Sequence, residues 1–99
     1  MLSKIKDIYD RVSEVNSYYL NNRELAVMDA RVKAFGMRVR YFRKLLGISQ
    51  DDLAEKAGMH RTYIGAIERG ERNVSLLNIL RLADALEIKV KELFNVDID

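Results

Sequence analysis

The sequence predicts an all-α protein, on three observations. It contains no proline, its apolar residues recur at alternating spacings of three and four, and its β-branched residues do not alternate as in strands. A chain of 99 residues suits one domain with an appendage and can bury a modest core.

The first predicted helix covers residues 2–20. Its apolar positions form a narrow seam, made of Ile5, Ile8, Val12, Val15 and Tyr19. The pair Asn21-Asn22 predicts a break after it, because asparagine tolerates turn conformations. The seam either folds back within the chain as a helical hairpin or pairs between two chains, and we expect a hairpin that contributes to dimerisation.

A second seam predicts helices at 23–34 and 36–46, either separate or fused. Its apolar positions are again spaced by three and four: Leu25, Met28, Val32, Phe35, Val39, Phe42 and Leu46. Gly36 lies inside this pattern, where glycine costs about 1 kcal/mol relative to alanine. It either bends or splits the helix.

Capping residues define the next helix at 50–57. Gly47 suits a left-handed C-terminal cap of the preceding helix. Ser49, followed three residues later by Asp52, predicts an N-terminal capping box. Gly58 ends the helix, because glycine accepts a positive φ at little steric cost.

Three further helices are predicted at 61–69, 76–86 and 88–94. Ser75 is a good N-cap for the second of them, whereas Lys89 is a poor cap for the last. The apolar residues expected in the core here are Leu76, Leu80, Ala83, Leu86, Leu93 and Phe94.

Composition excludes several classes of function. The chain has no cysteine and one histidine, which excludes disulfides and thiolate metal sites and argues against a histidine metal site or a catalytic triad. No nucleophile set or phosphate-binding loop is present, so we expect no enzyme and no cofactor. No apolar run approaches the ~20 residues of a membrane span. Cysteine usage fits a reducing compartment, and we expect a cytoplasmic protein.

Positive charge is concentrated in the middle of the chain. Residues 34–73 contain eight Lys and Arg residues against five Asp and Glu residues, a net charge of +3, whereas residues 74–99 have a net charge of −2. This excess favours a polyanionic partner only weakly.

Residues 47–70 predict a helix-turn-helix, two short helices joined by a tight glycine turn. Ala54 is small enough for the second helix to cross closely, and Ile64 and Ile67 would hold that helix against the core. Its outward face is then predicted to carry Arg61, Thr62, Gly65, Ala66 and Arg69. A polar, basic helix of this kind fits the major groove of B-DNA.

Four strings of residues lead to a family resemblance: "LGISQDDLAEKAG", "YIGAIERG", "LADAL" and "ELF". With them, residues 36–94 resemble the phage-repressor (lambda repressor/Cro-type, xenobiotic-response-element) helix-turn-helix domain. The segment "HRTYI" to "IERGERN" is also similar to restriction–modification controller proteins. The resemblance implies a five-helix DNA-binding domain that acts as a homodimeric transcriptional regulator on a pseudo-palindromic operator, without an evident small-molecule effector.

The resemblance also implies roles for individual residues. Arg61, Thr62 and Ala66 fall where the family contacts base edges, and Tyr63 falls where it contacts backbone or bases. The positions that match phosphate-backbone contacts are Gln50, Arg72, Asn73 and Ser75. Arg43 and Glu68 match a structural ion pair.

The expected organisation is a helical extension at 1–34, the DNA-binding domain at 35–95 and a tail at 96–99. The extension has no counterpart in the minimal domain, and it would serve dimerisation or partner binding. Two other functions remain open from sequence alone. One is an antitoxin whose extension wraps a toxin, and the other is a protein–protein adaptor that does not bind DNA.

Overall fold

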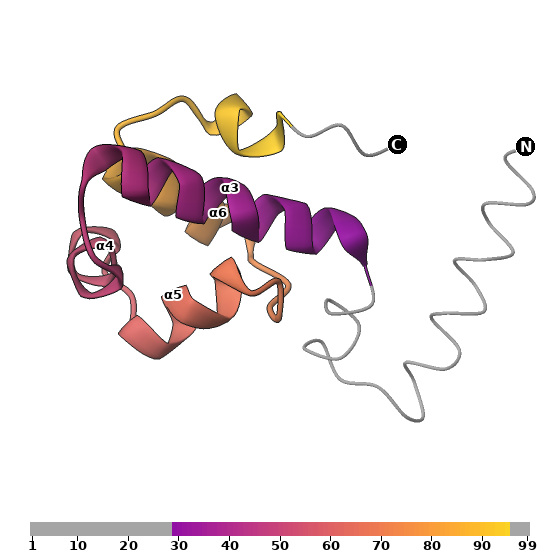
Figure 1. Ribbon diagram of the computed structural model, residues 1–99, viewed down its shortest axis with the longest axis horizontal. Helices are drawn as coiled ribbons and strands as arrows, with labels where there is room; N and C mark the ends of the chain where they lie inside the picture. Colours follow the sequence, from indigo (N-terminus) through magenta and orange to yellow (C-terminus); the bar gives the residue numbers. More distant parts are fainter. Residues whose placement is uncertain (1–28, 96–99) are drawn as a thin grey trace, which may run out of the picture.

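The computed structural model describes residues 29–95, which form four α-helices and one short 3-10 helix, with no strand in that range (Figure 1). In chain order these are α3 (Ala30–Leu46), α4 (Gln50–Ala57), α5 (Arg61–Glu68), α6 (Leu76–Ala85) and η1 (Val90–Phe94). The all-α prediction is confirmed for the described residues, with a 3-10 helix in place of the predicted fifth α-helix. The predicted helix at 2–20, the break after it and the tail at 96–99 lie outside them.

Helix α3 is one continuous helix, although two were considered. It begins at Ala30 because Asp29 has extended backbone and caps it, its side chain accepting a hydrogen bond from the Arg31 N–H at 2.8 Å. Asp29 therefore interrupts the helix predicted from residue 23 to 34, of which residues 23–28 lie outside the described range. The expected boundary between residues 34 and 35 falls inside α3. The helix ends at Gly47, whose φ of 76° is left-handed as predicted.

Gly36 permits a close approach between two helices. A Cβ atom at this position would lie well inside van der Waals contact of the Ile67 carbonyl oxygen and 3.0 Å from that of Glu68. The end of α5 therefore rests directly on the backbone of α3. This contact explains a glycine in the middle of the unbroken helix.

Helices α4 and α5 are joined by the predicted tight turn. Gly58 has a φ of 68°, and its N–H and that of Met59 donate to carbonyls of the last turn of α4. The predicted capping box at the start of α4 is formed, with both hydrogen bonds between Ser49 and Asp52 at 3.0 Å. The backbone N–H of Ser49 donates to the Asp52 carboxylate and holds its pKa below the ordinary value of 3.8.

Every element contributes to one buried core. Its largest fully buried side chains are Val39 from α3, Leu53 from α4, Ile64 and Ile67 from α5, Leu82 from α6 and Leu93 from η1. Complete burial of such a side chain contributes about 1.5–3 kcal/mol. The core thus fixes the positions of α4 and α5 relative to α3.

Three predicted core residues are exposed. Leu76 is 69% exposed, Leu80 is 41% exposed and Phe94 is 52% exposed. Leu80 lies two residues before the fully buried Leu82, so Leu76 and Leu80 are exposed because the side of α6 that carries them is left uncovered. Phe94 packs one face of its ring against Phe35, with centroids 5.6 Å apart, and leaves the rest in solvent.

Candidate nucleic-acid interface

The first turn of α5 carries two exposed polar side chains, Arg61 and Thr62. His60 precedes them with extended backbone, and its Nδ1 accepts a hydrogen bond from the Thr62 N–H at 3.1 Å. The opposite side of the helix is held by Ile64 and Ile67, which are almost completely buried as predicted. The side chains of the first turn therefore project from a helix whose position the core determines.

Arg61 forms an ion pair with the first turn of α4. Its Nε lies 3.2 Å from Oδ1 of Asp51, and the two side chains are 68% and 67% exposed. Pairs this exposed contribute at most about 1 kcal/mol to stability. The guanidinium group of Arg61 is therefore restrained but accessible.

Two residues of the predicted outward face, Gly65 and Ala66, are buried. Ala66 is 2% exposed, so it does not lie on the outward face as predicted. All residues from Ile64 to Glu68 are buried because α3 packs on one side of this short helix and α4 packs on another. Within residues 61–70, Arg61, Thr62 and Arg69 remain exposed.

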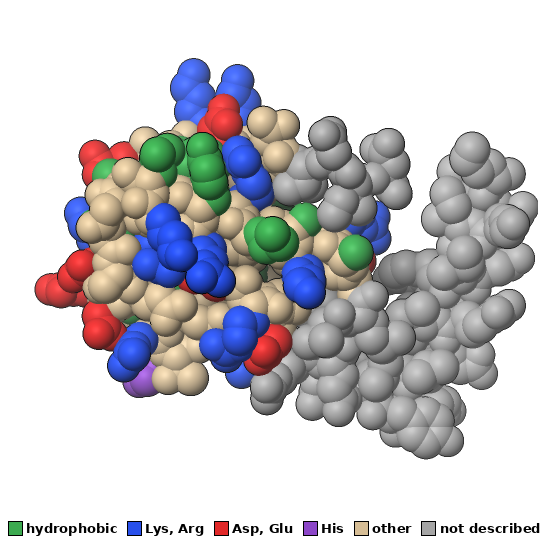
Figure 2. Space-filling view, in the orientation of Figure 1, with side chains coloured by type: hydrophobic (Ala, Val, Ile, Leu, Met, Phe, Trp, Pro, Cys, Tyr) green, Lys and Arg blue, Asp and Glu red, His purple; other side chains and the backbone are tan. Residues whose placement is uncertain are grey.

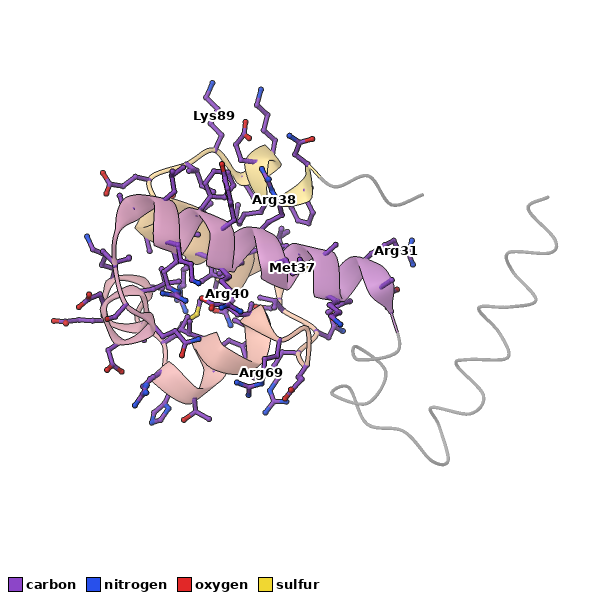
Figure 3. The ribbon with its side chains drawn as sticks, viewed as in Figure 1. Arg31, Met37, Arg38, Arg40, Arg69 and Lys89 are labelled. Atoms are coloured by element: carbon purple, nitrogen blue, oxygen red, sulfur yellow. The ribbon has the colours of Figure 1, made fainter. Side chains whose placement is uncertain are left out.

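Gly65 is covered by side chains rather than by backbone. A Cβ atom there would lie 3.1 Å from a terminal nitrogen of Arg69 and 3.7 Å from Oε1 of Gln50. Arg69 follows α5 and extends from its outer side, and its Nε bonds the Glu71 carboxylate at 2.9 Å (Figure 3). The close approach at Gly65 is thus made by the ends of two long polar side chains.

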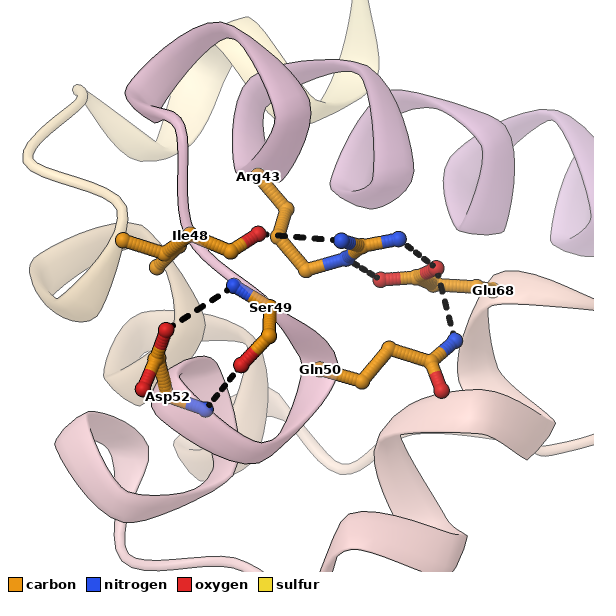
Figure 4. A network of polar contacts seen from close by, with 6 residues as sticks. All are labelled: Arg43, Ile48, Ser49, Gln50, Asp52 and Glu68. Atoms are coloured by element: carbon orange, nitrogen blue, oxygen red, sulfur yellow. Dashed lines mark hydrogen bonds and ion pairs between the residues drawn. The ribbon is translucent and has the colours of Figure 1, made fainter.

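A buried polar network joins α3, α4 and α5 (Figure 4). The predicted ion pair is present: Arg43 donates through Nε to Glu68 at 2.7 Å and through its second terminal nitrogen at 3.1 Å. The Arg43 side chain is 11% exposed and that of Glu68 is 3% exposed. Gln50 donates to the same carboxylate at 3.1 Å, and Arg43 donates to the Ile48 carbonyl at 3.0 Å. The network orients α5, since Glu68 accepts bonds from both neighbouring helices.

Tyr63 links α5 to α6. It is half-buried, and its hydroxyl lies 3.4 Å from the amide nitrogen of Asn78, a long hydrogen bond. Asn78 was not predicted as part of the site. No pattern in the sequence indicates that Asn78, 15 residues after Tyr63, contacts its hydroxyl group. The contact leaves the ring of Tyr63 at the edge of the exposed surface.

The loop between α5 and α6 holds the remaining predicted residues. Asn73 and Ser75 are exposed, and Ser75 caps α6, its hydroxyl accepting a bond from the Asn78 N–H at 3.2 Å. Arg72 is half-buried and donates to the Glu71 carbonyl at 3.0 Å. The loop and the start of α5 thus both present polar groups to solvent, whereas Asp and Glu side chains gather at the end of the molecule that carries α4 (Figure 2).

The described part of the chain contains no group of three or more His, Cys, Asp or Glu residues that could hold a metal ion. None of its helices is long and apolar enough to cross a membrane.

Comparisons with known proteins agree with this architecture. The helix-turn-helix family matches residues 39–93, more than half of the chain. The control protein C.SmaI of Serratia marcescens is 43% identical over 70 residues, which cover 71% of this chain and 82% of that protein.

Two solved structures show the same similarity. The restriction–modification controller protein C.AhdI from Aeromonas hydrophila is 52% identical with a TM-score of 0.66, and the match covers 67% of this chain and all of that one. The biofilm master regulator SinR, solved in complex with DNA, is 34% identical with a TM-score of 0.59, over 62% of this chain and 98% of that one.

Proposed function

This chain belongs to the helix-turn-helix family and is a DNA-binding transcriptional regulator, and we propose that it binds a pseudo-palindromic operator as a homodimer. The observation that carries the proposal is the exposed first turn of α5 on a helix whose other side is buried. In a dimer, the two α5 helices would occupy successive major grooves, about 34–36 Å apart.

Sequence preference in this proposal comes from Arg61 and Thr62. An arginine can bond O6 and N7 of guanine together, which discriminates against other bases by about 1–3 kcal/mol. Thr62 offers a hydroxyl and a methyl group, so it can contact a phosphate or a thymine methyl. Ala66 takes no part, because its side chain is buried.

Affinity in this proposal comes from contacts to the phosphate backbone by Gln50, Arg72, Asn73 and Ser75. Gln50 uses one amide hydrogen on Glu68 and retains a second for a phosphate. Tyr63, held at the edge of the surface by Asn78, would contact the backbone beside the groove. Neutralising phosphates with cationic groups makes binding salt-dependent, and Arg72 is the cation among these residues, so we expect affinity to fall as salt increases.

We further propose that the regulator is of the restriction–modification controller type, because C.AhdI is named as one and is 52% identical. The operator would then lie upstream of a controller gene, with a methyltransferase and a nuclease gene nearby. Determining which promoter the purified protein protects from nuclease cleavage tests this assignment.

The dimer contact is proposed on α6. Leu76, Leu77 and Leu80 are large apolar side chains with 41–69% of their area exposed, and burying them against a second copy would stabilise a dimer. The alternative site is the extension at 1–34. Sedimentation of two variants distinguishes these two sites. Leu80→Lys becomes monomeric if α6 forms the dimer contact, and a chain lacking residues 1–28 becomes monomeric if the extension forms it.

The experiment that tests operator binding is selection of bound duplexes from a random pool, followed by affinity measurements on the selected site. We expect Arg61→Ala to weaken binding to that site by about 1–3 kcal/mol and to relax the preference at one base pair. Lys89→Ala is the matched control, because Lys89 is exposed and lies on the side of the molecule away from α5 (Figure 3). Equal losses for both variants, or equal losses on all duplexes, would contradict a base contact by Arg61.

A further inference from the structure

The ion pair between Asp51 and Arg61 places a carboxylate on the proposed DNA surface. The distance of 3.2 Å joins Oδ1 of Asp51 to Nε of Arg61. An acidic group close to phosphates opposes DNA binding by charge repulsion. We therefore ask what favourable role of Asp51 offsets this repulsion between its carboxylate and the phosphates.

Stabilisation of the fold does not supply that role. Both side chains are about two-thirds exposed, and such pairs contribute little because solvent screens them and ordering two side chains costs entropy. Asp51 also lies in the first turn of α4, where a negative charge favours the helix dipole. The dipole requires no contact with Arg61, so it does not explain the pair.

The geometry of the pair leaves the guanine-binding end of Arg61 available. The guanidinium group has five N–H donors in a planar fork. The Asp51 carboxylate lies against Nε, the guanidinium nitrogen nearest the backbone, so the two terminal nitrogens remain for an acceptor pair. Those terminal nitrogens are the donors that match O6 and N7 of guanine.

We propose that Asp51 is a specificity-determining residue, which positions Arg61 for guanine through the ion pair at its Nε. The inference rests on the proposed function, because it takes Arg61 as the base-contacting residue. Holding the side chain in one orientation before binding reduces the entropy lost on contact. It also restricts the terminal nitrogens to one approach, which strengthens the preference for guanine over other bases.

The test uses the full chain and its selected operator, together with duplexes in which the base pair contacted by Arg61 is replaced. We expect Asp51→Asn to lower the ratio of affinities for guanine and non-guanine duplexes by about two- to five-fold, the factor that an exposed ion pair can supply. Affinity for unrelated duplexes should rise, because one negative charge is lost. Asp51→Glu should recover part of the discrimination.

Glu55→Gln is the matched control, because Glu55 is exposed and lies one turn further along the same face of α4. It should raise affinity for unrelated duplexes in a similar way and leave the ratio unchanged. A fall in the ratio for Glu55→Gln equal to that for Asp51→Asn would overturn the proposal, since charge alone would then explain the effect.

The double variant Arg61→Ala with Asp51→Asn separates positioning from direct contact. If Asp51 acts through Arg61, adding Asp51→Asn to Arg61→Ala leaves the base preference unchanged. A further change would show that Asp51 contacts a base itself and would overturn the proposal, as would an unchanged ratio for Asp51→Asn alone. If the unaltered protein selects no duplex, the proposed operator binding itself is refuted. That result differs from the outcomes that overturn only the role of Asp51.

Discussion

Replacing Gly36 by alanine tests whether the close contact between α3 and α5 determines the fold. The new methyl group would collide with the carbonyl oxygen of Ile67 and reach 3.0 Å from that of Glu68. Both are backbone atoms, so neither can rotate away. One helix must move by roughly 1 Å to restore van der Waals contact.

The magnitude follows from two opposing effects. Overpacking of this kind costs about 1–3 kcal/mol, and the upper end applies because the obstacle is backbone. Alanine recovers about 1 kcal/mol of helix propensity. We therefore expect Gly36→Ala to lower the free energy of unfolding by about 2 kcal/mol, which corresponds to a fall in Tm of roughly 10 °C for a domain of this size.

Gly65→Ala is the matched control for this prediction. The methyl group there meets the terminal nitrogen of Arg69 and the amide of Gln50, and both side chains can rotate aside. Helix propensity should then dominate, so stability stays the same or rises by up to about 1 kcal/mol. Urea unfolding followed by circular dichroism measures both variants. A Gly36→Ala protein as stable as the parent would refute the argument from close approach.

Substitutions at three further positions test the caps and the buried network. Arg43→Met should cost about 3 kcal/mol in urea unfolding because it leaves the buried Glu68 carboxylate without its cation, and a loss below about 1 kcal/mol would show that this carboxylate is readily resolvated. The pKa of Asp52 is lowered in the folded state, so its contribution is complete above the ordinary value of 3.8 and is lost as the pH falls through the lower folded value. Asp52→Asn should accordingly lower Tm at pH 7 and match the parent at pH 2, whereas an equal difference at both pH values would exclude ionisation as the cause. Gly58→Ala should cost about 1 kcal/mol from its left-handed backbone alone, since nothing lies within 4 Å of the added methyl, and Gly58→Asn should lose less if backbone conformation is the reason.

The local features of the fold could be predicted from sequence because they depend on neighbours in the chain. The capping box at Ser49 joins residues three apart, and the left-handed backbone at Gly47 and Gly58 depends on one residue's own conformational freedom. The ion pair of Arg43 and Glu68 spans 25 positions. Only the family resemblance predicted that pair.

The burial of particular side chains could not be predicted in this way. Helical spacing identifies an apolar face but does not tell which part of it the neighbouring helices cover, so Leu76 and Phe94 were wrongly assigned to the core. For the same reason Ala66 was placed on the outside, since α5 alone gives no sign that two helices flank it. The contact of Asp51 with Arg61 joins two helices across a turn, and only their packing brings those side chains together.

By itself the sequence determined where the described helices from residue 50 onward begin and end, to within two residues, and which side of α5 faces inward at Ile64 and Ile67. Hydrogen bonding within a turn and helical spacing involve residues only a few positions apart, so both can be recognised from the sequence alone. Tertiary structure alone decided that α3 runs unbroken through Gly36 and that the exposed surface of α5 is confined to its start. Both outcomes arise because α5 lies against the backbone of α3. These two helices are far apart in the sequence, and no local sequence pattern predicts how closely they pack.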